Sequence, residues 1–275
     1  MLRKKRMVLG VGCGLLVLLW LRHSEQQAEN QRRYQQREAE FNQLCRTRAG
    51  YKINRVVTEV EGIRLLKVRH RIQDGNMFAP GAAFGLEAKE DGYITSFLAN
   101  RCPIDSPDNS YFVSTGATKE SMPGFRYVDV LDDKDGKYYR YTGRWDEPWK
   151  YDKSYLKGYI KFFLDKVPSP QPLARYAVTF EDSVIPEERA KGFASSKVIV
   201  LDMQTNEVLA EMVRYVWGPS QPTSYTPNPW LTTDKCPMVS EGAESATRQF
   251  VDRVLVAKGA TLPPMPICKS CGQLP

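Results

Sequence analysis

VIVLDMQTNEVLAEMVRY, residues 198–215, is the stretch that decides the fold of this 275-residue chain. Its first four residues, Val198 to Leu201, form an uninterrupted apolar run, which is typical of a strand buried on both faces. Gln204-Thr205-Asn206 indicates a turn, and Glu207 to Trp217 then runs back as a second apolar-patterned segment. We therefore predict an antiparallel hairpin at the core of a β-rich domain.

The segments on either side of this hairpin belong to the same domain. Between Ala174 and Asp182, apolar and polar side chains alternate, as in a strand with one buried face. Pro186-Glu187-Glu188-Arg189 is suited to begin a short helix, because proline is tolerated at the first helical position. Gly218 to Pro237 is Pro-rich and indicates a long surface loop. Ser245 to Ala257 is patterned as an amphipathic helix that packs on the sheet.

Two further hairpins are predicted nearer the N-terminus. Phe125 to Leu131 and Lys137 to Tyr141 flank an Asp-Gly turn, which is a strong hairpin signal between aromatic-rich runs. Lys52 to Val60 and Ile63 to Ile72 are β-branched runs joined only by a Glu-Gly pair. That arrangement predicts a second hairpin.

Two shorter segments are also predicted as strands. Tyr93 to Leu98 follows the turn dipeptide Asp91-Gly92 and is predicted as a strand. The stretch from Lys150 to Val167 has apolar residues at helical spacing, but it is rich in strand-forming Tyr, Ile and Phe and contains Gly158. We therefore predict a strand over Tyr159 to Leu164, with a helix as the alternative.

The N-terminus carries an uncharged, mostly apolar run from Met7 to Leu21, directly behind four cations at positions 3–6. Clustered cations stay on the side of the membrane where they are made. We therefore predict residues 1–6 as a cytoplasmic basic segment and residues 7–22 as a transmembrane signal-anchor. The lipid bilayer is the partner expected for residues 7–22.

A cleaved signal peptide is the alternative, because the apolar run is short. At 1.5 Å per residue it spans about 22 Å, whereas the hydrocarbon core of a bilayer is about 30 Å thick. That length also suits the apolar part of a signal peptide. The small residues that cleavage needs are poorly placed: Ser24 follows Arg22 by two positions, and Ala28 follows Gln26. We therefore expect the segment to be retained.

Residues 23–49 are predicted to form a helical stalk, because they are rich in Gln, Glu and Arg and contain neither Pro nor Gly. Gly50 is suited to end this helix. A short dimerising coiled coil is the alternative. Residues 50–258 then form the β-rich exported domain, and residues 259–275 a Pro-rich tail with a CxxC motif. The expected fold class is α+β: a mainly antiparallel β domain with one packed C-terminal helix, after a transmembrane helix and stalk.

The net charge of +7 is concentrated at the N-terminus. Without the four cations at positions 3–6, the rest of the chain carries only +3. The basic character is therefore mainly a signal of membrane topology. No nucleic-acid partner is predicted.

The cysteines fit an exported domain, where disulfides persist. Five of the six lie beyond the apolar run and are candidates for disulfides: Cys45, Cys102, Cys236, Cys268 and Cys271. Because five is odd, one stays free or Cys45 pairs between chains, and the sequence leaves the connectivity open. The CxxC motif at 268–271 fits a disulfide best, with free thiols and a metal or redox centre as alternatives.

No residue is predicted to be catalytic, cofactor-binding or metal-binding, and no cofactor is expected. His23 and His70 are the two histidines, and neither lies near a nucleophile in the sequence. The Asp-rich turn at 132–136 does not fit the pattern of a calcium loop, and the sequence carries no phosphate-loop, nucleophile-elbow or dinucleotide motif. Acidic pairs such as Glu181-Asp182 suit solvated turns. An envelope hydrolase whose carboxylates meet only in the fold is the alternative function.

Two groups of aromatic residues are candidates for recognising a partner. They are Trp145, Trp149 and Tyr151, which lie beside basic residues, and Trp217, Tyr225 and Trp230, which are interleaved with prolines. Exposed aromatic side chains of this kind bind peptides or glycans. The alternative is that they cap the ends of the sheet.

Three stretches of the chain, Arg55 to Val68, Ala174 to Asp182 and Val198 to Tyr215, resemble a group of bacterial membrane-anchored envelope proteins without an assigned activity. The resemblance implies a bacterial envelope setting. Together with the apolar run behind four cations, it leads us to expect a single-pass protein of the bacterial inner membrane with a cytoplasmic N-terminus and a periplasmic domain. It transfers no catalytic residue. The expected function is that of a non-catalytic structural or partner-binding envelope protein, with an envelope protein as its partner.

Overall fold

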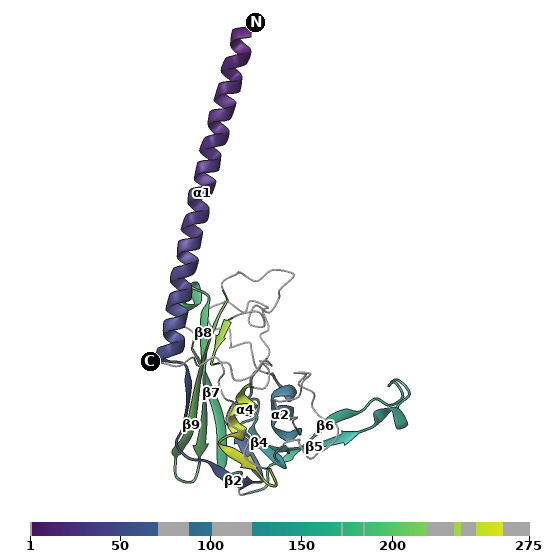
Figure 1. Ribbon diagram of the computed structural model, residues 1–275. Coiled ribbons are helices and arrows are strands. Elements are labelled where there is room, and N and C mark those ends of the chain that lie inside the picture. Colours follow the sequence, from purple (N-terminus) through teal and green to yellow (C-terminus); the bar gives the residue numbers. More distant parts are fainter. Residues whose placement is uncertain are drawn as a thin grey trace. The chain divides into compact units, whose positions relative to one another are not determined.

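The computed structural model describes residues 2–70, 88–100, 123–171, 173–183, 185–218, 234–237 and 246–260. The chain divides into two compact units, Met1–Thr47 and Arg48–Pro275. The first unit is a single long helix, α1 (Leu2–Thr47), and the second is an α+β unit built on one large sheet (Figure 1).

Helix α1 agrees with the helix predicted over 23–49, although it ends at Thr47. Gly50 follows with a φ of +141°, a conformation that glycine adopts without strain, and begins the first strand. In the part of the chain that the structure describes, no helix combines the length and the apolar character that crossing a membrane requires. The membrane anchor over residues 7–22 stays a prediction.

The large sheet has nine strands and is mixed, but mostly antiparallel. Its order is β1-β9-β8-β7-β3-β4-β5-β6, with β10 also paired to β9, and only β3 pairs in parallel with its neighbours β4 and β7. The strands are β1 (Gly50–Ile53), β3 (Gly62–Leu65), β4 (Tyr127–Leu131), β5 (Tyr138–Asp146), β6 (Lys161–Pro168), β7 (Tyr176–Ser183), β8 (Phe193–Asp202), β9 (Glu207–Trp217) and β10 (Asp234–Cys236).

The smaller elements complete the second unit. Strands β2 (Val57–Val60) and β11 (Leu255–Ala257) form a separate parallel pair. The helices are α2 (Asp91–Leu98), α3 (Pro186–Ala190), α4 (Ala246–Asp252) and the single 3-10 turn η1 (Pro148–Lys150). The fold is therefore α+β with a helix near the C-terminal end of the described chain, as the sequence predicts.

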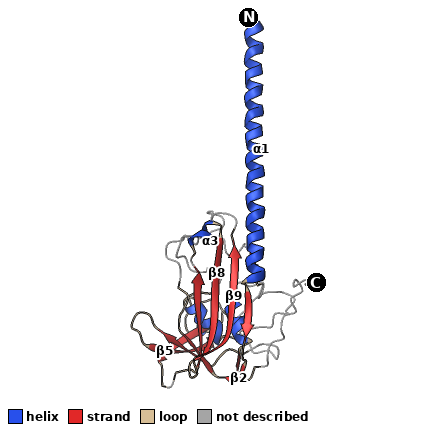
Figure 2. Cartoon of the chain, turned by 90° about the vertical axis from the view of Figure 1, so that its left-hand side faces the viewer, coloured by secondary structure: helices blue, strands red, loops and turns tan. Residues whose placement is uncertain are grey.

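The predicted central hairpin is confirmed: β8 and β9 are long, adjacent antiparallel strands, and β7 flanks β8 (Figure 2). Val178, Val200 and Ala210 lie opposite one another on these three strands and are completely buried. Ile199 and Leu201, which point to the other face of β8, are only half-buried. The apolar run at 198–201 is therefore fully buried on one face and not on both.

Helices α2 and α4 contribute side chains to the same core cluster as the sheet (Figure 1). Phe97 of α2 and Phe250 of α4 are fully buried. Arg248 of α4 is also buried; it donates hydrogen bonds to the carbonyl of Ser96, which lies in α2, and to Asp252 (2.6 Å). This arginine satisfies carbonyl groups that a helix end leaves without an intrahelical partner.

The predicted strand over Tyr93 to Leu98 is wrong, because these residues lie in α2. Tyr93, Ile94, Phe97 and Leu98 are its buried residues, and their spacing places them on one helical face. The two apolar pairs, Tyr93-Ile94 and Phe97-Leu98, are three and four residues apart, which is the spacing of one face of a helix.

The predicted hairpin across Glu61-Gly62 is also wrong, because β2 pairs with β11 and β3 pairs with β4 and β7. The Glu61 carbonyl accepts a hydrogen bond from the backbone N–H of Arg126 (2.8 Å). Gly62 lies opposite Tyr127, where a Cβ atom would overlap the tyrosine ring. The glycine therefore serves a close approach between neighbouring strands and not a turn.

In the C-terminal half of the chain, the bounds of three predicted segments differ from those in the structure. Asp234–Cys236 forms β10 within the predicted loop, and the helix predicted over Ser245 to Ala257 ends at Asp252, after which Leu255–Ala257 forms β11. The strand predicted at Tyr159 begins at Lys161. The end of the helix reflects the pairing of β11 with β2, a strand distant in sequence, which local patterns do not report.

Candidate recognition surface on the arm

Strands β5 and β6 continue beyond the rest of the sheet as a two-stranded arm (Figure 1). Strand β4 pairs only with Tyr138 to Tyr141 of β5, whereas β6 accompanies β5 as far as the pair Asp146 and Lys161. We call residues 142–165 the arm, and the loop at 147–160 between its strands the tip. The arm holds seven aromatic residues among 24, against 11% in the whole chain, so it is enriched in side chains suited to contact.

The base of the arm is fixed by Asp129, a completely buried carboxylate on β4. It accepts two hydrogen bonds from Arg140 of β5 (2.7 and 2.8 Å), one from the hydroxyl of Ser169 (2.6 Å) and one from the backbone N–H of Ala174 (2.8 Å). Arg140 also lies over the Tyr127 ring, 3.7 Å from its centroid. Residues that precede and follow the arm in the sequence thus meet at one charge.

Burial by itself would raise the pKa of Asp129, because it disfavours the charged form. The hydrogen bonds from Arg140, Ser169 and Ala174 favour the carboxylate and outweigh burial, so the pKa of Asp129 lies below its ordinary value. Asp129 is therefore an ionised structural group.

Side-chain contacts between the two strands hold the middle of the arm. Arg144 forms ion pairs with Asp146 (2.6 Å) and Asp165 (3.2 Å). The Trp145 ring packs edge-on against Phe162, with 4.9 Å between the centroids. Cross-strand pairs of this kind stabilise a two-stranded ribbon.

The tip is folded into hydrogen-bonded turns. The backbone N–H groups of Tyr151 and Asp152 donate to the Pro148 carbonyl (3.1 and 2.8 Å), and that of Tyr159 donates to the Leu156 carbonyl (3.0 Å). Gly158, with a φ of +87°, makes the second turn without strain. The rings of Tyr155 and Tyr159 stack 5.4 Å apart, so the tip has a defined conformation.

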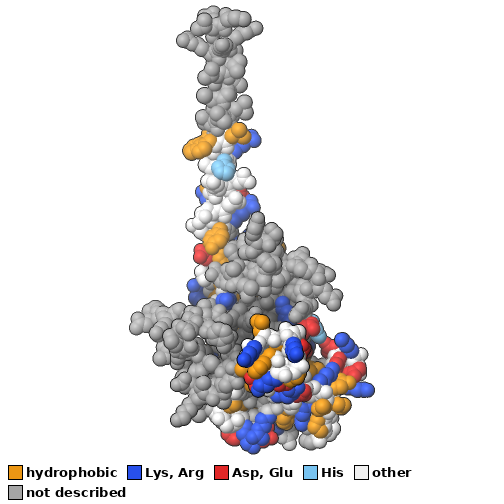
Figure 3. All heavy atoms as spheres, turned by 90° about the vertical axis from the view of Figure 1, so that its right-hand side faces the viewer, with side chains coloured by type: hydrophobic (Ala, Val, Ile, Leu, Met, Phe, Trp, Pro, Cys, Tyr) orange, Lys and Arg blue, Asp and Glu red, His pale blue; other side chains and the backbone are white. Residues whose placement is uncertain are grey.

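The tip exposes large apolar side chains. Leu156 is 84% exposed and Tyr151 66%, and Tyr159 and Ile160 are exposed as well. Figure 3 faces the side on which the arm projects, and hydrophobic and basic side chains lie intermingled there. A cluster of exposed apolar side chains bordered by charges is typical of a contact surface.

Only some of the charged side chains of the tip are paired with an opposite charge. Glu147 forms an ion pair with Lys150, and Asp152 accepts the backbone N–H of Ser154 (2.9 Å). Lys153 and Lys157 are exposed, and neither forms an ion pair within the described residues. The outward charge of the tip is therefore positive.

The predicted aromatic candidates divide between the arm and the core. Trp145 lies at the end of β5, Trp149 lies in η1, and the exposed Tyr151 follows it, so the structure places all three on or beside the tip. Trp217 is completely buried at the end of β9, with its ring edge-on to Phe193. That position fits the alternative of capping the sheet. Tyr225 and Trp230 lie outside the described residues.

Sequence patterns did not single out the most exposed residues of the tip, Leu156, Lys153 and Lys157. The helical spacing of apolar residues in this stretch obscured the loop between two strands. The available signal was composition, because aromatic residues and lysines are concentrated between two strand-forming runs.

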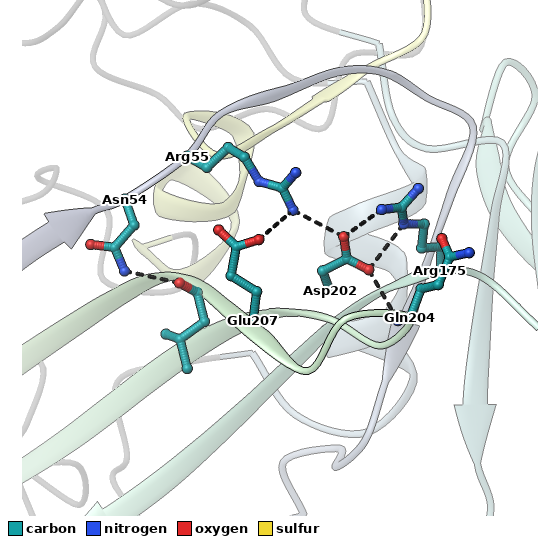
Figure 4. A network of polar contacts seen from close by, with 7 residues as sticks. Asn54, Arg55, Arg175, Asp202, Gln204 and Glu207 are labelled. Carbon is teal, nitrogen blue, oxygen red and sulfur yellow. Dashed lines mark hydrogen bonds and ion pairs between the residues drawn. The ribbon is translucent and has the colours of Figure 1, made fainter.

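A second buried charge, Asp202, closes the turn between β8 and β9 (Figure 4). Arg175 donates two hydrogen bonds to it (2.9 and 2.7 Å), Arg55 one (2.9 Å), and the backbone N–H of Gln204 another (3.0 Å). The hydrogen bond from Arg175 is the largest cause that holds the pKa of Asp202 well below its usual range. Arg55 also pairs with Glu207 (2.8 Å). This network is structural, because its carboxylate is fully occupied.

The histidine and carboxylate candidates do not form a reaction centre among the described residues. His70 is exposed and contacts two carboxylates, Asp133 (2.8 Å) and Glu90 (3.8 Å). Asp182 accepts two hydrogen bonds from the buried Arg69, each at 3.0 Å. Within the described ranges, no group of three or more His, Cys, Asp and Glu side chains is placed to hold a metal ion.

The expectation of a disulfide is confirmed, because Cys45 and Cys236 are disulfide-bonded. Cys102, Cys268 and Cys271 lie outside the described residues, so the CxxC motif stays a prediction. Comparison of the chain with protein-family models, with curated proteins and with solved structures gave no match. Its function is therefore inferred from its own residues.

Proposed function

We propose that this chain is a non-catalytic protein of the bacterial envelope, tethered to the inner membrane by residues 7–22, whose domain recruits a partner outside the cytoplasm. The observation that carries the proposal is the arm. Its base is fixed by the buried Asp129 and its tip exposes Leu156 and Tyr151. Such a surface binds with little loss of conformational freedom, because it is ordered before it meets a partner.

Two features support the proposed location. The apolar run at Met7 to Leu21 behind four cations is the pattern of a signal-anchor with a cytoplasmic N-terminus. The disulfide-bonded Cys45 and Cys236 suit an oxidising compartment, because cytoplasmic thiols are kept reduced. Both features agree with a domain that acts on the far side of the membrane.

The state of the carboxyl groups supports a non-catalytic role. A general acid needs a carboxyl whose pKa is raised. Among the described residues, hydrogen bonds and ion pairs lower the pKa of every carboxyl group with a distinct shift: Glu61, Asp129, Asp132, Asp135, Asp146, Asp152 and Asp202. These groups suit ion pairing.

The test removes the tip and keeps the fold. Because Asp146 and Lys161 are the last pair of β5 and β6, residues 147–160 can be replaced by Asn-Gly, which forms a tight hairpin turn. We expect this short-loop variant to unfold at the same temperature as the parent protein and to keep Cys45 and Cys236 protected from thiol reagents. Cells that carry it should show the phenotype of cells lacking the gene.

A second measurement tests the location. A reporter enzyme that is active only outside the cytoplasm, fused after Pro275, should be active. A silent reporter would reverse the proposed topology. A short-loop variant that is folded, present at normal level and fully functional would remove the arm from the proposed function.

A further inference from the structure

We propose that the partner of the arm tip is the surface of an anionic lipid bilayer. This inference rests on the proposed function and names the chemistry of its partner. Three features of the tip carry it: its most exposed apolar side chain, its unneutralised lysines and its small convex form.

The most exposed apolar side chain is Leu156, at 84%. It lies in the loop between the arm strands and is flanked by the stacked rings of Tyr155 and Tyr159. A leucine in this position gains from entering an apolar phase. Tyrosine rings favour the headgroup level of a bilayer, where the ring is apolar and the hydroxyl is hydrated. The tip therefore carries an apolar side chain suited to the acyl region of a bilayer, between two rings suited to its headgroup level.

The lysines lie on both sides of this leucine. Lys153 precedes it by three residues and Lys157 follows it directly, and both are exposed without an ion pair among the described residues. Lys161 begins β6 and lies over the Phe163 ring, 4.9 Å from its centroid. Lysine stems extend along apolar surface while the ammonium group stays in water. Each such lysine strengthens binding to an anionic surface about fivefold.

The acidic groups of the arm oppose such binding little, because they are engaged within the arm. Asp146 accepts hydrogen bonds from Arg144 (2.6 Å) and from the Tyr151 hydroxyl (2.9 Å), and these lower the pKa of Asp146. Glu147 pairs with Lys150. Asp152 is turned back to the N–H of Ser154 (2.9 Å). Asp152 nevertheless stays ionised and exposed, so the three lysines and two carboxylates of the tip give it a net charge of +1. The cations without an ion pair among the described residues are Lys153 and Lys157.

The size of the tip favours lipid over an acidic protein. A stable protein interface needs about 800 Å² from each partner and 20 or more residues, whereas the tip is a 14-residue loop on a two-stranded ribbon. A bilayer needs no matching concave surface. It accepts a small convex apolar tip bordered by cations.

The experiment places a benzophenone side chain at position 156 in the full chain, reconstituted in vesicles. Headgroup-labelled lipid is present both in the vesicles that hold the protein and in protein-free vesicles added to them. With phosphatidylglycerol and phosphatidylethanolamine, we expect labelled lipid to be crosslinked at position 156 at least ten times more than at the control position 134. Lys134 is exposed in the turn at the opposite end of β5.

Charge variants separate the lysines from the apolar contact. Lys153→Gln together with Lys157→Gln should lower the crosslinking at position 156 about 25-fold below saturation, as expected for two independent contributions. The matched control, Lys134→Gln with Lys137→Gln, removes the same charge from the β4–β5 turn and should leave the yield unchanged. Neutral phosphatidylcholine vesicles should give a yield as low as that of the tip double variant.

Equal crosslinking at positions 156 and 134, or equal yields in anionic and neutral vesicles, would overturn the lipid assignment. The same benzophenone in intact cells then distinguishes the two proposals. A specific protein adduct at 156 with no lipid adduct would refute the lipid surface and retain recruitment by the arm. No adduct of either kind, with a functional short-loop variant, would refute both.

Discussion

The base and the tip of the arm differ in which side chains they bury. The base buries a charged group, whereas the tip exposes apolar side chains. At the base, Asp129 is completely buried and every hydrogen bond it accepts comes from the protein. At the tip, Leu156 is 84% exposed, and Lys153 and Lys157 make no ion pair among the described residues. Stability therefore depends on the base of the arm and contact on its tip, so substitutions at the two places should have different consequences.

The largest difference should appear when the same charge is placed in the core and on the tip. Val200→Asp puts a carboxylate without a partner on a completely buried position, and we expect loss of cooperative unfolding, because net stability is only about 5–15 kcal/mol. Leu156→Asp should change the free energy of unfolding by less than about 0.5 kcal/mol. Urea denaturation followed by tryptophan fluorescence measures both. A stable Val200→Asp variant would mean that β8 is not the core strand.

The next largest effect concerns the base of the arm. Asp129→Ala leaves the guanidinium of Arg140, which is mostly buried, without its carboxylate. Breaking a buried pair in this way costs about 3–5 kcal/mol. Asp152→Ala at the tip is the matched control and should cost less than about 0.5 kcal/mol, because this carboxylate is exposed. Urea denaturation measures the free energy of unfolding of both variants. Similar losses of stability would mean that the base of the arm is no more important for stability than the tip.

Acid should weaken the base of the arm and the β8–β9 turn more than it weakens the tip. The pKa values of Asp129 and Asp202 are lowered in the folded protein, so the unfolded chain takes up protons first as the pH falls. Stability should therefore be steady from about pH 7 to 5 and decrease below about pH 4. Asp202→Asn should be less stable at pH 7 and lose less on acidification. If Asp152→Asn reduced the pH dependence of stability as much as Asp202→Asn does, this prediction would be wrong.

A smaller effect is expected at Gly143, between the base and the tip. A Cβ atom here would overlap the Phe162 ring, which would have to move away from Trp145. Gly143→Ala should therefore cost about 1–3 kcal/mol, whereas Thr142→Ala, at an exposed neighbouring position, should cost less than about 0.5 kcal/mol. Near-ultraviolet circular dichroism should report the displaced tryptophan only in the first variant.

The sequence predicted those parts of the fold that are decided locally. The alternation at 176–180 and the turn at 204–206 identified β7, β8 and β9, and the Asp-Gly turn identified β4 and β5. The pairing of Val57 with Leu255 could not be predicted, because these residues come from the two ends of the unit.

The candidate surface was predicted only in part, for a physical reason. Trp145, Trp149 and Tyr151 were identified by composition, but the exposure of Leu156 depends on tertiary packing, because the loop that carries it lies beyond the part of β5 that pairs with β4. Trp217 shows the converse. It has the composition of a contact residue, yet the strand that carries it ends in the core.

The pairing of β2 with β11 bears on how the protein is made. Val57 lies close to the start of the second unit, and its partner Leu255 is among the last residues described. Strand β2 therefore cannot form this pair until residue 255 has been synthesised. Closure of this part of the unit is consequently a late step of folding, because it needs a contact between residues far apart in the sequence.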